Sequence, residues 1–167
     1  HLRQQLVISI AAGLRLPDLS RWLGGHEKLV RAMPNTPALI GSGVTGLFAL
    51  PSVSEVERTG AERVMQAVGN TLWVQDENRI DAITAISGSG PAYAFLFIEA
   101  LQQAATELGF NQRQARLLSI ETVLGAARLA AQSEDPASVL RERVTSKGGT
   151  TEAALHVMNE RGLKECI

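Results

Sequence analysis

The chain has 167 residues, of which 45% are hydrophobic and 20% charged, and its formal net charge is −1. This composition is typical of a globular protein with a sizeable core, and it gives no basic surface for nucleic acid or for an anionic membrane. No apolar run approaches the roughly 20 residues that span a bilayer. The single cysteine, Cys166, has no partner for a disulfide within the chain, so a reducing, cytoplasmic setting is expected.

The first half of the chain alternates short apolar runs with turns, which predicts an α/β fold. The strand at 6–13 ends in small residues and Gly13, as in a parallel sheet that opens into a tight turn. Ser54 and Glu57 have the spacing of a capping box at a helix start. In chain order the predicted elements are strand 6–13, a helix within 16–25, strand 28–33 ended by the prolines of PNTP, strand 43–50, helix 54–69 and strand 70–75.

From residue 77 onward the pattern predicts only helices, so we place a domain boundary between residues 76 and 77. The segment 91–108 is apolar on nearly all sides, which indicates a helix buried in a core or between subunits. Its aromatic residues Tyr93, Phe95 and Phe97 are expected in the core. The predicted helices are 79–86, 91–108, 112–132 with Asn111 as its cap, 135–144 and 151–162.

One motif matches a nucleotide-binding pattern without its context. Gly41 to Gly46, GSGVTG, satisfies G-x-G-x-x-G, but the dinucleotide fingerprint needs a strand before it and a helix that opens on its third glycine. A strand-like segment follows here instead. We therefore interpret GSGVTG as a loop.

A second glycine motif, VTSKGGTTEAAL at 144–155, precedes a predicted helix. Gly148 and Gly149 allow a tight bend, Thr150 or Thr151 is expected to cap the helix, and Glu152 suits its first turn. Free amides at a helix N-terminus bind anions such as a carboxylate. A plain glycine turn with a threonine cap is the alternative. The motif SGSGP at 87–91 has the same two interpretations, a turn or a close approach of backbone to a ligand.

Other chemical signals are weak. His1, His26 and His156 share no metal-ligand spacing, and surface or loop positions are expected for all three. Glu77 and Asp81 are four residues apart, which suits either a carboxylate pair in a pocket or a solvated helix start. Without a nucleophile set or a metal cluster, the chain fits chemistry that a cofactor supplies.

Five motifs, taken in order and spacing, resemble pyrroline-5-carboxylate reductase, the enzyme of the last step of proline synthesis: VISIAAG, RAMPNTPALIGSG, ISGSGPAYAFLFIEAL, GAARL and VTSKGGTTEAAL. The resemblance covers essentially the whole chain. It implies the C-terminal part of a Rossmann NADP-binding domain at 1–76. It also implies a helical dimerisation and substrate-binding domain at 77–167, of the 6-phosphogluconate dehydrogenase C-terminal-like type. The family's opening strand–glycine turn–helix and its extreme C-terminus are missing, so this fragment alone is expected to be inactive.

The resemblance also assigns residues, with NADPH or NADH as cofactor, pyrroline-5-carboxylate as substrate, a homodimer or larger homo-oligomer as assembly, and no metal. Cofactor-binding positions are Ile10, Ala11, Ala12 and Gly13 on one side of the nicotinamide, Met33, Asn35, Thr36 and Pro37 on the other, and Arg143. Substrate-binding positions are Glu77, Val144, Ser146, Gly148, Gly149, Thr150 and Thr151. Thr151 is the expected catalytic residue, as the hydrogen-bond partner of the ring nitrogen. Lys147 stands where the family often has proline.

Two alternatives remain open from the sequence. A reductase of the hydroxyacid or 6-phosphogluconate dehydrogenase type would need a catalytic lysine on the long helix, and residues 93–108 contain none. A non-catalytic helical dimerisation module would use both glycine motifs only as turns. Specific binding of proline or of a cyclic acid analogue would separate the enzyme from this module.

Overall fold

The computed structural model describes residue 2 and residues 4–167 and divides the chain into two compact units. The first unit ends at Phe97 and the second runs from Ile98 to Ile167, so the division falls within helix α4 (Gly90–Glu107). The domain boundary expected between residues 76 and 77 stays a prediction.

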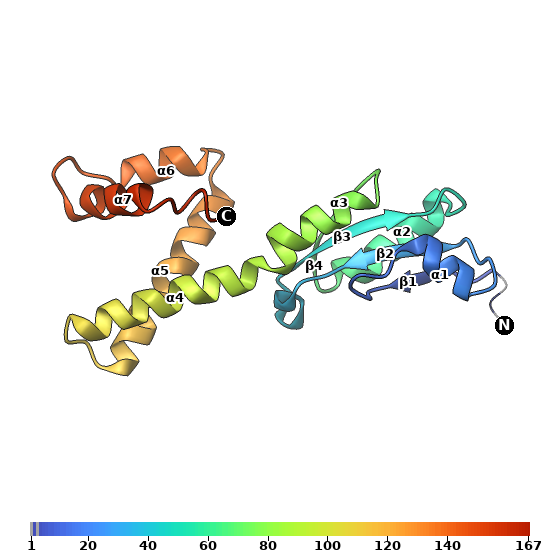
Figure 1. The fold of residues 1–167 in the computed structure, drawn as a ribbon, viewed down its shortest axis with the longest axis horizontal. Helices are drawn as coiled ribbons and strands as arrows, with labels where there is room; N and C mark the ends of the chain where they lie inside the picture. The colour runs from blue at the N-terminus through green and yellow to red at the C-terminus, as the bar shows by residue number, and fades with distance from the viewer. Residues whose placement is uncertain (1, 3) are drawn as a thin grey trace. The chain divides into compact units, whose positions relative to one another are not determined.

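The first unit is an α/β layer (Figure 1). Its four strands lie in the order β1-β2-β3-β4. In chain order its elements are β1 (Val7–Ser9), α1 (Leu16–Trp22), β2 (Leu29–Met33), the 3-10 helix η1 (Thr36–Ile40), β3 (Gly43–Ala49), α2 (Glu55–Gln66), β4 (Gly69–Trp73), α3 (Asn78–Ile83), the π-helical turn η2 (Thr84–Gly88) and the first part of α4.

The sheet is mixed. β1, within the strand predicted at 6–13, lies in a parallel pair as expected, but the sheet as a whole is not parallel. β1 pairs with β2 and β3 with β4 in parallel, whereas β2 and β3 are antiparallel. The physical reason is the connection between β2 and β3. It contains only the short helix η1, and a parallel crossover needs a dozen or more residues.

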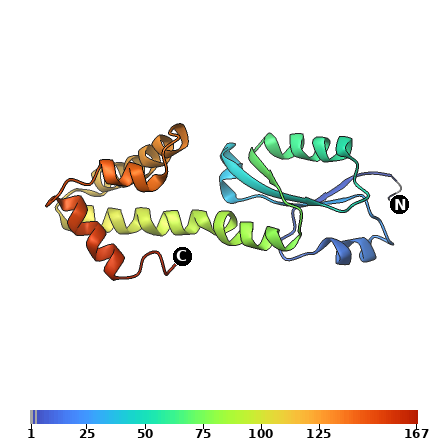
Figure 2. The same ribbon diagram turned by 90° about the horizontal axis from the view of Figure 1, so that it is seen from above.

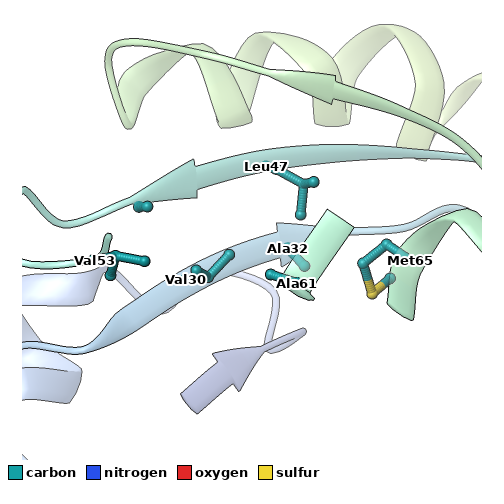
Figure 3. Packing of buried hydrophobic residues seen from close by; sticks show 7 residues of the cluster. Val30, Ala32, Leu47, Val53, Ala61 and Met65 are labelled. Carbon is teal, nitrogen blue, oxygen red and sulfur yellow. The ribbon is translucent and has the colours of Figure 1, made fainter. Parts of the chain in front are cut away.

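The main hydrophobic core lies between the sheet and α2 (Figure 3). Alternate residues of the two central strands point to this side, and α2 supplies Ala61 and Met65. The capping box of Ser54 and Glu57 begins this helix as predicted. The helix ends at Gln66, before the expected Gly69, because Gly69 already begins β4. The buried cluster consists of Val30, Ala32, Leu47, Ala49, Val53, Ala61 and Met65.

Helices α1 and α3 cover the opposite face of the sheet (Figure 2). Close packing of α3 depends on Gly46 in β3. A Cβ atom at this position would lie 2.8 Å from Ile83 Cδ1 and 3.2 Å from Ile80 Cδ1. β3 begins at Gly43, which confirms the strand predicted at 43–50 and limits the loop interpretation of GSGVTG to Gly41 and Ser42. No helix opens at Gly46, in agreement with the rejection of the dinucleotide motif.

The second unit is all-helical, so the predicted class, α/β followed by all-α, is confirmed. Its elements are the remainder of α4, α5 (Gln112–Gln132), α6 (Ala137–Arg143) and α7 (Thr150–Glu160). Asn111 caps α5 as predicted and exchanges two hydrogen bonds with Gln114 in a capping box. Among residues 2 and 4–167, none of the helices combines the length and hydropathy that a membrane crossing needs.

The aromatic side chains of α4 are exposed, so the expectation that Tyr93, Phe95 and Phe97 lie in the core is wrong. Helix α4 contains no buried residue. Its apolar pattern extends around the helix, and the described chain covers too little of it. The other interpretation of this pattern, a helix buried between subunits, stays a prediction.

Candidate functional site

The turn at residues 10–13 lies at the end of a parallel strand pair. β1 and β2 run in the same direction, so the segments that follow Ser9 and Met33 leave the sheet at one edge. In open α/β sheets this edge is where ligands bind. Ile10 is 63% exposed and Gly13 has a φ of +75°, while the amide of Ala11 bonds to Ser9 Oγ at 3.4 Å.

The predicted second wall, Met33 to Pro37, is held mainly by Asn35. Its Oδ1 accepts a hydrogen bond from the amide of Val44 at 2.9 Å. Its Nδ2 donates to the carbonyl oxygen of Ser87 at 3.0 Å and to the hydroxyl of Ser87 at 3.1 Å. Asn35 therefore ties the end of β2, the start of β3 and the π-helical turn together. Thr36 and Pro37 open the 3-10 helix η1.

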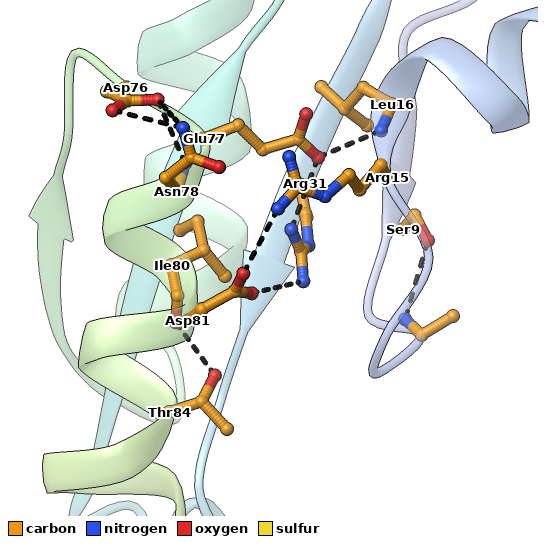
Figure 4. Close-up of polar contacts among 11 residues, drawn as sticks. Ser9, Arg15, Leu16, Arg31, Asp76, Glu77, Asn78, Ile80, Asp81 and Thr84 are labelled. Carbon is orange, nitrogen blue, oxygen red and sulfur yellow. Dashed lines mark hydrogen bonds and ion pairs between the residues drawn. The ribbon is translucent and has the colours of Figure 1, made fainter.

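Glu77 lies in an ion-pair network at the start of α3 (Figure 4). Its Oε1 accepts hydrogen bonds from Arg31 Nη1 at 3.2 Å and from the amide of Leu16 at 2.9 Å. Arg31 Nη2 reaches Asp81 Oδ1 at 3.2 Å, and Arg15 reaches Asp81 Oδ2 at 3.4 Å. Glu77 and Asp81 therefore face one shared cation, Arg31.

Asp76, just before this network, takes a different role. The pKa of its carboxyl is lowered, chiefly because the backbone amide of Asn78 donates to it, with a further bond from the Asn78 side chain. This contact fixes the first turn of α3 and leaves Glu77 directed at Arg31.

The glycine loop of the second unit forms a tight turn before α7. The amide of Gly149 bonds to the carbonyl oxygen of Ser146 at 3.0 Å, and Gly148 has a φ of +71°, which favours glycine. Gly149 is the N-cap, and α7 begins at Thr150, so the expected cap at Thr150 or Thr151 is wrong. The turn brings the chain into the helix one residue earlier than expected.

The start of α7 presents exposed polar groups. The amides of the first helical turn have no partner within a helix. The side chains of Thr150 and Thr151 are exposed, and neither caps the helix. The carboxylate of Glu152, in the first turn as predicted, accepts a hydrogen bond from the amide of Gly148 at 2.6 Å. A shallow pocket here is lined by Gly148, Gly149, Glu152, Ala153 and His156.

The remaining predicted positions of the second unit lie on α6 and its exit. Arg143 pairs with Asp135 at 2.6 Å, with both side chains exposed. Val144 is the exposed C-cap of α6, and Lys147 is exposed in the loop. The structure therefore gathers Ser146 to Thr151 at one helix start and leaves Arg143 paired on the surface.

The histidines lie in surface or partly exposed positions. Nε2 of His26 lies 2.8 Å from the carbonyl oxygen of Gln5, and the exposed His156 pairs with Glu160 at 3.3 Å. His1 lies outside the described residues. Within residues 2 and 4–167, no three His, Cys, Asp or Glu side chains gather as metal ligands would.

The sequence pattern did not identify two residues that hold these segments in place. Arg31 interrupts the apolar strand LVRAM, and a cation at such a position signals a buried ion pair. Ser87 belongs to the SGSGP motif, but its contact with Asn35 joins residues 52 apart, and no local pattern reveals it.

The residues at the sheet edge fit a flat cofactor ring. The turn 10–13 carries no polar side chain. The segment that follows β2 leaves the sheet at the same edge as this turn. At the start of α7, exposed hydroxyls and backbone amides fit an anion.

The family model described as pyrroline-5-carboxylate reductase dimerisation matches residues 77–167. Pyrroline-5-carboxylate reductase of Pseudomonas aeruginosa is 46% identical over 164 residues, which cover 98% of this chain and 60% of that protein. The second such reductase of Bacillus subtilis is 36% identical and is likewise covered over 60% of its length. The chain thus spans about 60% of the length of these curated relatives.

Solved structures agree with the sequence relatives. The pyrroline-5-carboxylate reductase of Coxiella burnetii matches with a TM-score of 0.91 and 49% identity, over 95% of this chain and 59% of that chain. The Plasmodium falciparum pyrroline carboxylate reductase, solved with NADP bound, matches with a TM-score of 0.88 and 30% identity, over 97% and 65%. With a family model that matches more than half of its residues, this chain belongs to the pyrroline-5-carboxylate reductase family.

Proposed function

We propose that the full gene product containing this chain is a pyrroline-5-carboxylate reductase, which reduces the C=N bond of 1-pyrroline-5-carboxylate to give L-proline. The observation that carries the proposal is the start of α7 in a chain of this family. A glycine turn leads there into a helix whose first two residues are the exposed Thr150 and Thr151, and the amides of a first helical turn have no partner within the helix. The relatives' names support the reaction.

The substrate carboxylate is proposed to bind residues 146–151. A helix N-terminus carries a partial positive charge, and its amides point toward an anion in front of it. Gly148 and Gly149 present no side chain that would keep a small carboxylate from the backbone. Ser146 and Thr150 add hydroxyls. Val144, the C-cap of α6, comes just before this loop in the chain. The family resemblance also assigns Glu77 to the substrate, but its side chain is only 11% exposed and its carboxylate is bonded to Arg31 and to the amide of Leu16.

Thr151 is the proposed catalytic residue. Its hydroxyl hydrogen-bonds the ring nitrogen and relays to it the single proton that gives the protonated imine, while the loop fixes the carboxylate. A protonated imine is already electrophilic, so the main contribution of the protein is orientation. No strong side-chain acid is then required.

NADPH, or NADH, is the proposed cofactor, held on one side by Ile10 to Gly13 and on the other by Met33 and Asn35 to Pro37, with Arg143 as a further contact. When bound, this cofactor supplies the hydride. The apolar turn 10–13 gives the ring a flat surface and excludes water from it. Support comes from the relative solved with NADP bound.

A homodimer or larger homo-oligomer is the proposed assembly. The described helices of the second unit bury only Ala115 and Ser119, while many of their large apolar side chains are exposed. Such surfaces mark contacts with another chain. The description of the matching family as a dimerisation domain supports a second copy as the partner. The single, exposed Cys166 suits a reducing cytoplasm.

The test is NADPH oxidation by the full gene product with pyrroline-5-carboxylate, compared with Thr151→Ala. The matched control is Thr145→Ala, because the Thr145 hydroxyl bonds to the carbonyl oxygen of Arg141 at 2.7 Å. We expect kcat/KM to fall about 100-fold in Thr151→Ala, as for loss of a positioned proton donor, and to change little in the control. Full activity in Thr151→Ala would contradict its role, and no turnover in the wild type would contradict the proposed function.

A further inference from the structure

Arg31 is the only charged residue among the buried residues of the described chain, with 2% exposure. Burial of a cation is costly unless it is paired, and Arg31 is paired through two nitrogens with Glu77 and Asp81. The Glu77 side chain is 11% exposed and the Asp81 side chain 56%, so Glu77 is the buried partner.

The two ends of the turn at 10–13 are both connected to Arg31. In the sheet, Arg31 pairs in register with Ser9, the last residue of β1. Beyond the turn, the Oε1 atom of Glu77 that binds Arg31 also accepts the amide of Leu16, the first residue of α1. The side-chain network, shown in Figure 4, thus fixes where the turn ends, and the backbone pairing of Arg31 with Ser9 fixes where it begins.

The turn itself contributes little to its own conformation. The bond from the Ala11 amide to Ser9 Oγ is long, at 3.4 Å, and Gly13 adopts a positive φ. Ile10 and Ala12 are exposed. The turn therefore depends on its two flanks, Ser9 and Leu16.

We propose that Arg31 and Glu77 are positioning residues, which hold the turn Ile10–Gly13 in the conformation that binds the dinucleotide cofactor. The cofactor part of this inference rests on the proposed function. Glu77 then acts through Leu16 and Arg31, and its effect falls on the cofactor more than on the substrate. Asp81, more exposed and also bonded to Arg15, holds the second Arg31 nitrogen.

The first experiment measures amide hydrogen exchange in the full gene product. Glu77→Gln keeps an acceptor for Leu16 but removes the charge, and the double variant Arg31→Met/Glu77→Leu removes the acceptor without leaving an unpaired buried cation. The control is Glu62→Gln, because Glu62 binds Thr71 at 2.9 Å at another place in the same unit. We expect exchange of residues 11–16 to rise on the order of tenfold in the double variant, the effect of one lost hydrogen bond. The control leaves these amides unchanged.

The second experiment measures binding constants of the same variants for NADPH alone and for proline. Cofactor Kd is expected to rise about fivefold or more in the folded double variant, and the proline Kd to stay within about twofold. Unchanged exchange at 11–16 in the folded double variant overturns the inference. So does a change confined to proline, which would assign Glu77 to the substrate pocket. A wild-type protein that binds no dinucleotide contradicts the proposed function, while the exchange data still decide whether the pair fixes the turn.

Discussion

At the residue scale, the side chain of Glu152 binds one backbone amide of the glycine loop. Glu152 Oε2 accepts the Gly148 amide at 2.6 Å and places a negative charge in the pocket at the start of α7. A bound carboxylate at the same helix start would meet this charge. The side chain therefore stabilises the turn and opposes an anion beside it.

Replacement of this charge is expected to strengthen substrate binding. In Glu152→Gln of the full gene product, KM for pyrroline-5-carboxylate should fall about two- to fivefold, as expected for loss of one repulsive charge near a helix N-terminus. Steady-state kinetics checks this, with Glu160→Gln as the control, because Glu160 pairs with His156 later on α7. A KM that rises in Glu152→Gln would contradict this prediction. It would show that the bond between Glu152 and the Gly148 amide matters more for substrate binding than the repulsion between the two carboxylates.

Glu57 makes folding stability depend on pH. Its pKa is lowered from 4.5 to about 2, chiefly by the hydrogen bond from Lys28 Nζ at 2.6 Å and then by the amide of Ser54. The folded state thus binds the proton less readily than the unfolded chain. The stabilisation is complete above pH 4.5 and is lost as the pH falls toward 2.

Urea unfolding of the wild type and Glu57→Gln at pH 6 and pH 3 measures this contribution. We expect the wild type to be the more stable at pH 6, and the difference to shrink at pH 3. The sign follows from a folded pKa below the unfolded one. A difference that grows on acidification would contradict the assigned pairing of Glu57 with Lys28.

At the element scale, Asn35 joins segments that no helix or strand connects. Its three hydrogen bonds reach β3 at Val44 and the π-helical turn at Ser87. In this turn the amide of Ser89 bonds to the carbonyl oxygen of Thr84, five residues earlier. The widened turn lies between α3 and α4, and such turns are frequent at functional sites.

Asn35→Ala is expected to lower the free energy of unfolding by about 2 kcal/mol, because it leaves the Val44 amide and the Ser87 carbonyl without their partner. Asn78→Ala is the control, since Asn78 is exposed and its side chain binds Asp76. The loss of unfolding free energy in Asn78→Ala is expected to be small. Chemical denaturation compares the two, and equal losses would contradict the role of Asn35 as the connector.

Most elements of the fold could be predicted because their signals are local. The capping boxes at Ser54 and Asn111 mark helix starts within four residues of sequence. The antiparallel β3 and the Arg31–Glu77 pair could not be predicted, because strand direction and ion pairing depend on residues far apart in the chain. For the site, motif similarity indicated the loop at 146–151, while its cap at Gly149 depends on backbone geometry that Thr150 and Thr151 do not reveal.

At the scale of the whole molecule, the exposed apolar surface of the second unit is the main unexplained feature of a single chain. Helix α5 alone exposes Leu117, Leu118, Leu124 and Leu129. A monomer rarely leaves so much apolar surface uncovered. The proposed second copy would cover it, and the described chain would then have a second core formed by two subunits.

Leu117→Glu is expected to shift the full gene product from oligomer toward monomer, because a carboxylate would be buried at the contact. The control is Val64→Glu on α2, where the side chain is 60% exposed against 61% for Leu117. Sedimentation velocity at micromolar concentration compares both with the wild type. An unchanged oligomer in Leu117→Glu would remove this face of α5 from the proposed contact.

The most direct measurement is the amount of L-proline that the full gene product forms from 1-pyrroline-5-carboxylate for each NADPH oxidised. The account predicts one proline per NADPH, with formation dependent on both reactants and suppressed in Thr151→Ala. A folded protein that binds NADPH and produces no proline would contradict the account and would leave a non-catalytic dimerisation module as the function of this chain.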